Sequence, residues 1–215
     1  KEGKGVCQAY AMAAYHMFVE AGLEVHYVTG WAGEAHAWNL VKVDGEWFHI
    51  DPTWNDPTFQ TSFTGIENYI RYKYFLLSDA TLLSERTMDE RPNLPKATSE
   101  RFAAIRSIQS VPFEYNRIPY VLLPEYNNNV MYFVNYQDDT FGIDMIDLAA
   151  AVPIVERFAN VEAMDILATS EAIYFVNVDK NFGLSKIDLQ TKAVTNLYTG
   201  GTVTSIQLNG DMVQA

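Results

Sequence analysis

The dipeptide Asp44-Gly45 constrains the fold of this 215-residue chain more than any other feature, because it joins two segments that alternate apolar and polar residues. Both residues tolerate the positive φ angles of a two-residue type I′ turn, so residues 35–43 and 46–50 are predicted to form a β-hairpin. Val43 then pairs with Glu46, and this pair sets the register of the whole hairpin.

Alternation places His36, Trp38 and His49 on the same face of the hairpin as Asp51. In the predicted register Trp38 lies opposite Asp51, so His36 is a diagonal neighbour of Asp51. Diagonal neighbours lie about 7–8 Å apart, which is within side-chain reach. A hydrogen bond between the His36 imidazole and the Asp51 carboxylate is therefore predicted.

A helix, a further strand and an aromatic segment surround the hairpin. The Ala-rich and Met-rich segment Gln8–Ala21 predicts a helix that Gly22 ends, and Val25–Thr29 predicts a strand. The aromatic run Tyr69–Phe75 is read as a buried strand that follows a loop over residues 56–65. A short helix capped at Ser78 or Asp79 comes next.

Composition excludes several classes of function. The 27 acidic residues outnumber the 15 Lys and Arg, and the net charge of −12 argues against a nucleic-acid surface. No run approaches the roughly 18 apolar residues of a membrane span, so no membrane insertion is expected. The single cysteine excludes an intrachain disulfide framework, and the sequence indicates no cofactor.

The second half of the chain contains an internal repeat. Residues 130–135 (VMYFVN) match residues 172–177 (AIYFVN), and Ile146-Asp147-Leu148 matches Ile187-Asp188-Leu189. A period of about 40 residues in short strands is typical of propeller-like blades. We expect a first domain over residues 1–95 and a β-repeat domain over 96–215, whose units form antiparallel meanders in an array that looks truncated rather than a closed ring.

Cys7 stands where thiol chemistry is favoured. At the start of a helix, unpaired N–H groups and the helix dipole stabilise a thiolate, although a lone cysteine at such a place, taken by itself, more often serves packing. The chain order Cys7, His36, Asp51 supplies a nucleophile, a base and an orienting acid. The N–H of Cys7 is the first candidate oxyanion donor.

Three motifs resemble the transglutaminase-like superfamily of papain-type thiol enzymes: GVCQAY at 5–10, HAWN at 36–39 and WFHIDPTW at 47–54. The resemblance spans about residues 3–90. It implies an α+β fold in which the cysteine helix packs on an antiparallel sheet, with Cys7, His36 and Asp51 as the catalytic triad. It also implies further helices upstream of the cysteine, whereas six residues precede it here, and calcium dependence is not carried over.

The resemblance implies acyl transfer or hydrolysis at peptide bonds or glutamine side chains, and proteolysis or amidase activity is favoured over crosslinking. Trp31, Gly33, Trp38 and Trp54 are the expected substrate-binding residues. A protein or peptide substrate is expected, with a cell-wall or surface protein as a possible partner of the β repeats. Those repeats also suggest an extracytoplasmic setting.

Three alternatives stay open. His49 shares a face with Asp51 and could replace His36 as the base. His36, His49 and Asp51 could together bind zinc, although the thiol is better explained as a nucleophile and no metal is predicted. The chain could also be a non-catalytic binding module that keeps the triad fold as a scaffold.

Overall fold

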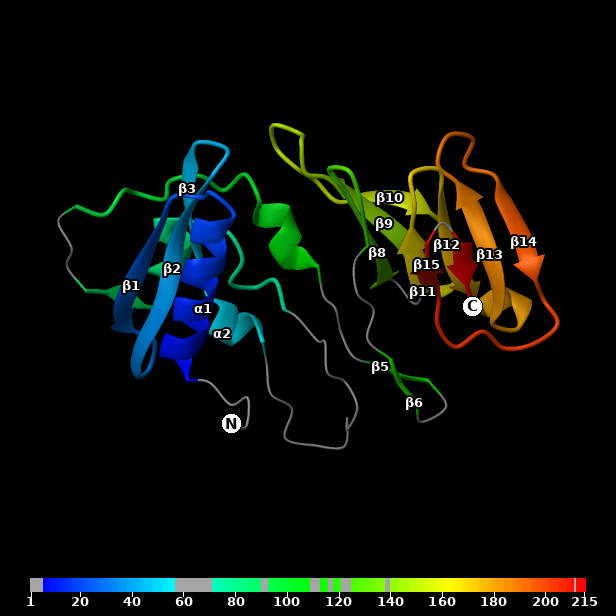
Figure 1. Cartoon of the computed structure of the whole chain (residues 1–215), viewed down its shortest axis with the longest axis horizontal. Helices are drawn as coiled ribbons and strands as arrows, with labels where there is room; N and C mark the ends of the chain where they lie inside the picture. The colour runs from blue at the N-terminus through cyan, green and yellow to red at the C-terminus, as the bar shows by residue number, and fades with distance from the viewer. Residues whose placement is uncertain are drawn as a thin grey trace. The chain divides into compact units, whose positions relative to one another are not determined.

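The computed structural model describes residues 6–56, 71–89, 93–108, 113–115, 118–120, 125–137, 140–210 and 212–215. Contacts divide these residues into two units, one ending at residue 108 and the other beginning at residue 113 (Figure 1). The boundary predicted between residues 95 and 96 thus falls inside the first unit. The division into a catalytic and a repeat domain stays a prediction.

The first unit is built on a four-stranded antiparallel sheet with the strand order β3-β2-β1-β4. Its strands are β1 (Val25–Trp31), β2 (Ala35–Val43), β3 (Glu46–Ile50) and β4 (Thr87–Met88). Val, Trp, Phe and Tyr are frequent in the three longer strands and favour an extended backbone. The bounds of β2 and β3 agree with the sequence prediction, whereas β1 continues two residues further.

The predicted register of the β2–β3 hairpin is confirmed. Asp44 and Gly45 have φ angles of +50° and +85°, as a type I′ turn requires, and Val43 pairs with Glu46. The ladder ends one pair before the expected Trp38–Asp51 pair. At the next position the N–H of Asp51 points away from β2 and donates to the carbonyl of Tyr74 (3.0 Å).

Helix α1 (Cys7–Glu20) packs on one face of this sheet. Ala, Met and Gln favour the helical backbone. The helix ends before Ala21, and Gly22 follows with a φ of +77°, the left-handed conformation in which glycine commonly terminates helices. Asn39 of β2 donates from Nδ2 to the carbonyl of Ala11 (3.0 Å), so a buried hydrogen bond fixes the helix to the sheet.

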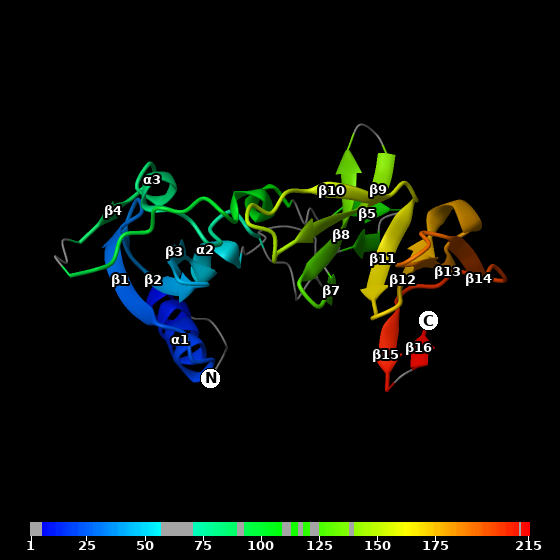
Figure 2. The same ribbon diagram turned by 90° about the horizontal axis from the view of Figure 1, so that it is seen from above.

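The opposite face of the sheet packs against the segment that follows residue 71. Figure 2 shows α1 and the short helix α3 (Asp79–Leu82) on opposite sides of the sheet. Ser78 is the N-cap of α3, since its hydroxyl accepts the N–H of Thr81 (3.1 Å). The core on this side is formed by Val28, Trp38, Leu40, Tyr74, Leu77, Leu82 and Ala97.

The described part of the aromatic run, from residue 71 to 75, is a turn, so the strand predicted there is wrong. Tyr72 and Tyr74 are buried as expected. The backbone of Tyr74 bonds to the N–H of Asp51 and to the side chain of Asn55, and it is therefore not free to pair with a strand. Tyr69 and most of the predicted 56–65 loop lie outside the described residues.

Gly30 allows β4 to approach β1 closely. A Cβ atom at this position would lie 2.1 Å from the carbonyl oxygen of Thr87 and 2.7 Å from the ring of Trp38. Gly30 pairs with His36 on one side and with β4 on the other. The glycine thereby places Arg86, the residue before β4, at the end of the sheet that carries His36.

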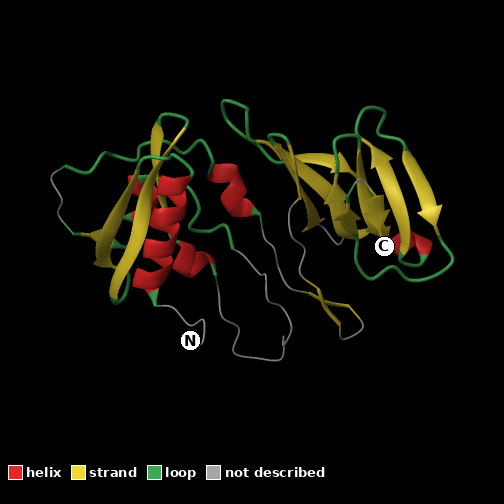
Figure 3. Ribbon diagram, viewed as in Figure 1, coloured by secondary structure: helices red, strands yellow, loops and turns green. Residues whose placement is uncertain are grey.

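The second unit contains two four-stranded antiparallel sheets (Figure 3). The first, in the order β10-β9-β8-β7, consists of β7 (Glu125–Asn127), β8 (Val130–Gln137), β9 (Thr140–Asp147) and β10 (Glu156–Ala159). The second, in the order β11-β12-β13-β14, consists of β11 (Ala163–Ala168), β12 (Ala172–Asn177), β13 (Gly183–Asp188) and β14 (Val194–Tyr198). Both are meanders in which neighbours in sequence are neighbours in the sheet.

The sequence repeat falls on equivalent strands of these two sheets. In the first sheet Asn135 donates from Nδ2 to Asp144 (2.5 Å), from β8 to β9. In the second sheet Asn177 donates from Nδ2 to Ser185 (3.1 Å), from β12 to β13. A polar contact from an asparagine to the next strand therefore recurs at the same place in both sheets, about 40 residues apart.

The remaining elements are short. They are α2 (Pro52–Asn55), the 3₁₀ turns η1 (Ala103–Ser107) and η2 (Val178–Lys180), and the strand pairs β5 (Phe113–Tyr115) with β6 (Ile118–Tyr120) and β15 (Gln207–Asn209) with β16 (Met212–Gln214). Within the described ranges, none of the helices has both the length and the apolar character needed to cross a bilayer.

Candidate active site

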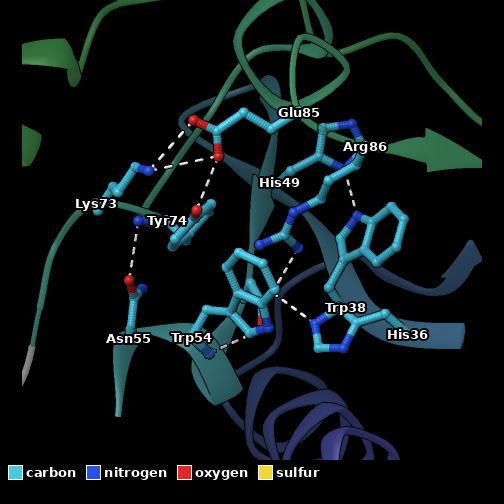
Figure 4. A network of polar contacts seen from close by, with 10 residues as sticks. His36, Trp38, His49, Trp54, Asn55, Lys73, Tyr74, Glu85 and Arg86 are labelled. Atoms are coloured by element: carbon cyan, nitrogen blue, oxygen red, sulfur yellow. Dashed lines mark hydrogen bonds and ion pairs between the residues drawn. The ribbon is translucent and has the colours of Figure 1, made fainter. Parts of the chain in front are cut away.

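His36, which Figure 4 labels, forms the predicted imidazole–carboxylate pair with Asp51. His36 lies near the start of β2, and Asp51 follows β3 directly. The hairpin therefore brings together two residues that are 15 positions apart. Nε2 of His36 lies 2.7 Å from Oδ2 of Asp51, and both side chains are buried. This hydrogen bond occurs in a site from which water is largely excluded, where electrostatic interactions are strong.

The other carboxylate oxygen of Asp51 holds a helix end. Asp51 is the N-cap of α2, and its Oδ1 accepts the N–H of Trp54 (3.2 Å). Pro52 occupies the first turn of α2, where its fixed φ suits a helix and its missing N–H costs nothing. The Asp-Pro sequence thus explains why the chain turns here and why the carboxylate cannot rotate freely.

Arg86 is a third partner of Asp51, which the sequence analysis missed. Its Nη1 donates to Oδ2 of Asp51 (2.5 Å), and both side chains are fully buried. A single arginine 35 residues after Asp51 gives no periodic or motif signal. Its neighbours Glu85 and Thr87 are both polar, so the local sequence does not mark it as a buried residue.

Asp51 stays ionised in this environment. Burial alone raises the pKa of the carboxyl, but the hydrogen bonds from His36 and Arg86 and their charges outweigh it, and the net pKa lies below the ordinary aspartate value. An ionised Asp51 can only accept hydrogen bonds, so Nε2 of His36 carries a proton when it donates to Oδ2. This leaves Nδ1 of a neutral His36 as the basic nitrogen.

Two indole rings hold the imidazole of His36. Trp38 stacks on it with ring centroids 6.1 Å apart. The ring of Trp54, a residue of α2, has its centroid 5.7 Å from that of the imidazole. Throughout the described part of the chain, Nδ1 of His36 has no hydrogen-bond partner. The ring is thus fixed through Nε2 and its faces, with Nδ1 left for a reactant.

His49 makes different contacts, although it shares the face of Asp51. Trp38 donates from Nε1 to Nδ1 of His49 (3.1 Å), so Nε2 of His49 donates to Asp79 (2.9 Å). Burial lowers the pKa of His49, and the opposing contact with Asp79 does not compensate. Both nitrogens are occupied and the ring is fully buried, which argues against His49 as the base.

Cys7 is the first residue of α1 and is half-buried. Helix geometry leaves the N–H groups of the first turn without intrahelical partners. The hydroxyl of Tyr10, one turn later, donates to Asp56 at the end of α2 (2.5 Å). Among the described residues the thiol has no hydrogen bond to His36, so the structure forms the His36–Asp51 pair but not the contact with sulfur.

A comparison with family models bears on these three residues. Residues 1–52 match the transglutaminase-like superfamily. The matched segment contains Cys7, His36 and Asp51, and it supports a cysteine-enzyme function at the level of the superfamily. Searches of curated proteins and of solved structures found no match.

The residues predicted to bind substrate differ in their exposure and in their distance from His36. Trp31 is 55% exposed at the end of β1, and Gly33 lies in the following loop with a φ of +85°. Trp54 is 38% exposed beside His36. Trp38 is completely buried behind His36, so its position does not fit a substrate contact and fits support of the imidazole instead.

The zinc alternative requires three ligands in one place. Of the residues that the structure describes, no three His, Cys, Asp or Glu side chains are grouped to hold a metal ion. His36 and Asp51 bind each other, whereas His49 binds Trp38 and Asp79. The described residues of the first unit therefore present a histidine–carboxylate pair rather than a cluster of ligands.

Proposed function

We propose that the chain is a transglutaminase-like cysteine hydrolase or acyltransferase that acts on peptide or glutamine side-chain amides through Cys7, His36 and Asp51. The observation that carries this proposal is the buried 2.7 Å contact between His36 and Asp51, in a segment that matches the superfamily. It leaves Nδ1 of His36 as the free nitrogen, and Cys7 begins the helix that packs on the same hairpin.

In the proposed reaction, Nδ1 of His36 takes the proton of the Cys7 thiol. The sulfur attacks the amide carbon, and the carbonyl π electrons move to oxygen. The N–H groups at the start of α1 are suited to stabilise this oxyanion. When the intermediate collapses, the C–N bond breaks and His36 returns its proton to the leaving amine, which leaves a thioester on Cys7.

The thioester is released when water, or an amine, attacks its carbon after giving a proton to His36. Attack by water regenerates the thiol and yields a carboxylic acid, whereas attack by an amine yields a new amide. We favour water, because crosslinking requires a site that admits an amine and excludes water, and nothing in the sequence indicates such a site.

For the second unit we propose propeller-like blades that position the enzyme on a protein or cell-wall partner. The support is the recurrence of four-stranded meanders with the Asn135 and Asn177 contacts at equivalent places. Blades of this kind present loops at the sheet ends to partners, without a need for a cofactor.

A second candidate function is a non-catalytic binding module. It is favoured by one observation, namely that the thiol of Cys7 is not hydrogen-bonded to His36 among the described residues. Contacts in a free enzyme are often longer than those in its substrate complex, which is why we rank this function second.

The test is the rate at which iodoacetamide alkylates Cys7 as a function of pH, in the wild type and in His36→Ala. The chain has one cysteine, so all label reports on Cys7. We expect a reactive plateau well below the free-thiol pKa of about 8.5 in the wild type, lost in the variant. Equal, slow alkylation that rises near the free-thiol pKa in both proteins would contradict the proposed enzymatic function and favour a non-catalytic binding module.

A substrate assay complements alkylation. N-blocked Gln-Gly with hydroxylamine reports acyl transfer, and casein cleavage reports proteolysis. We expect Cys7→Ala to abolish the activity that the wild type shows, since the thioester cannot form without the thiol.

A further inference from the structure

We propose that Arg86 is a positioning residue of the triad, which keeps the Asp51 carboxylate ionised and turned toward His36 and thereby sets the pH range in which Cys7 is nucleophilic. The proposal rests on the proposed function, since it assigns Arg86 a role in activating the thiol.

The first support is the geometry of the carboxylate. Arg86 Nη1 and His36 Nε2 both donate to Oδ2 of Asp51, at 2.5 and 2.7 Å, while Oδ1 accepts the N–H of Trp54. Three donors from three different segments therefore fix the plane of the carboxylate. Loss of Arg86 would leave Oδ2 held by His36 alone.

The second support is the aromatic cage around the guanidinium. Its carbon lies 4.4 Å from the ring centroids of both Trp54 and Tyr74, and 5.7 Å from that of Trp38. Figure 4 shows the guanidinium between the rings of Tyr74 and Trp54. Trp54 and Trp38 are also the rings that contact His36, so arginine and imidazole share their packing partners.

The third support is that the guanidinium of Arg86 forms its hydrogen bond to an anion with Asp51. Nε and Nη2 of Arg86 are buried without a hydrogen-bond partner in the described part of the chain, so Asp51 is its hydrogen-bonded anion there. Burial of an ion pair is a weak source of stability, because the desolvation of both groups offsets their attraction. A role in the chemistry explains the pair better than stability does.

Other titratable groups near Arg86 are few. Among the described residues, His49 contacts Trp38, and Glu85 accepts hydrogen bonds from Tyr74 and Lys73. Asp79 is paired with His49. Glu85 and Lys73 are exposed at the edge of the cage, so the charges at its centre are those of Arg86 and Asp51.

The direction of the effect follows from electrostatics. Removal of a buried positive charge makes proton loss harder for every group in the site. Burial already opposes ionisation of Asp51, and Arg86 is one of the two contacts that overcome it. Without Arg86 the alkylation profile of Cys7 should therefore move to higher pH.

The experiment compares Arg86→Gln, which removes the charge, with Arg86→Lys, which keeps it. Arg101→Gln is the matched control. Arg101 pairs with Asp44 (3.0 Å) at the far end of β2 from His36, and it also lies over an aromatic ring. For each protein, the pH midpoint of Cys7 alkylation is measured after a check of the fold by circular dichroism.

We expect the midpoint of Arg86→Gln to rise by about 1–3 pH units, and that of Arg86→Lys and Arg101→Gln to stay near the wild-type value. A folded Arg86→Gln protein that is slower at every pH but keeps its midpoint would overturn the proposal. If Cys7 of the wild type is alkylated only near the pH at which a free thiol ionises, the proposed enzymatic function is wrong. That result is seen in the wild type alone, so it is distinguishable from a failure of the proposal for Arg86.

A measurement on the wild type covers the case in which Arg86→Gln does not fold. Carbon-13 NMR of the aspartate carboxyls follows the titration of Asp51 directly. We expect Asp51 to titrate with a pKa below the ordinary aspartate value of 3.8, whereas a pKa at or above that value would contradict the proposal.

Discussion

Oδ2 of Asp51 lies 2.7 Å from Nε2 of His36, while Oδ1 of the same carboxylate caps helix α2. One side chain thus joins the end of β3, the start of β2 and the helix that carries Trp54. The cap fixes the carboxylate before any substrate arrives, so the imidazole is oriented by the fold rather than by the reactants.

Asp51→Asn should destabilise the first unit by about 3–5 kcal/mol, because Arg86 is left as a buried, uncompensated charge. Loss of the cap contributes little, since asparagine caps helices as well as aspartate does. The double variant Asp51→Asn/Arg86→Gln should recover part of this stability but not the thiol reactivity. Urea unfolding and alkylation at pH 7 measure the two effects, and a double variant no more stable than Asp51→Asn would contradict the explanation.

Asp79→Asn is the matched control for the carboxylate. It alters a similar contact, Asp79 with His49 (2.9 Å), at a histidine that we do not assign to the reaction. We expect the alkylation rate of Cys7 to remain within about twofold of the wild type. A loss as large as that in Asp51→Asn would point to His49 as the base.

Protonation of His49 should make the stability of the first unit fall as the pH falls below about 6.5. The pKa of His49 is lowered in the folded state by burial, so the unfolded chain binds a proton that the folded chain does not. The contribution of neutral His49 to the free energy of unfolding is fully present above the ordinary histidine pKa of 6.5. It is lost as the pH falls from there toward the lowered pKa of His49 in the folded state, with a slope of at most about 1.4 kcal/mol per pH unit.

Tryptophan fluorescence during urea unfolding measures this dependence in the first unit alone, because all four tryptophans lie there: Trp31, Trp38, Trp47 and Trp54. His49→Gln should remove the dependence, whereas His16→Gln, at an exposed position on α1, should keep it. Equal slopes in both variants would mean that another group causes the effect.

Asn39→Ala should loosen α1, which carries Cys7. The variant removes the buried hydrogen bond to the carbonyl of Ala11, at a cost of about 1–3 kcal/mol. Misplacement of the nucleophile by about 1 Å can lower turnover about 10²-fold. Hydroxamate formation from N-blocked Gln-Gly checks this. Asn177→Ala, which breaks a similar buried contact in the second unit, should change neither turnover nor tryptophan-detected unfolding.

Trp31→Ala tests whether the loop after β1 contacts substrate. The side chain is largely exposed, so its loss should alter stability by no more than about 0.5 kcal/mol. If the loop lines the substrate groove, KM for N-blocked Gln-Gly should rise several-fold while the rate of Cys7 alkylation stays the same. An unchanged KM would remove Trp31 from the substrate-binding residues.

Local rules were sufficient for the hairpin and the helix. Asp44-Gly45 specified the turn because few residue pairs tolerate two positive φ angles, and strand alternation then brought His36 to Asp51. The aromatic run was misassigned because its residues favour strands, whereas tertiary contacts of Tyr74 with Asp51 and Asn55 hold it as a turn. Strand propensity predicts the backbone poorly where tertiary hydrogen bonds favour another conformation.

The sequence by itself determined the β2–β3 register, the presence of a helix next to Cys7 and the pairing of His36 with Asp51, because each depends on neighbours along the chain. Only the tertiary structure decided that Arg86 binds Asp51 and that His49 binds Trp38 and Asp79. The contact between Arg86 and Asp51 needs β4 to pair at Gly30, a close approach that no local pattern encodes. Long-range burial, rather than periodicity, selects such partners.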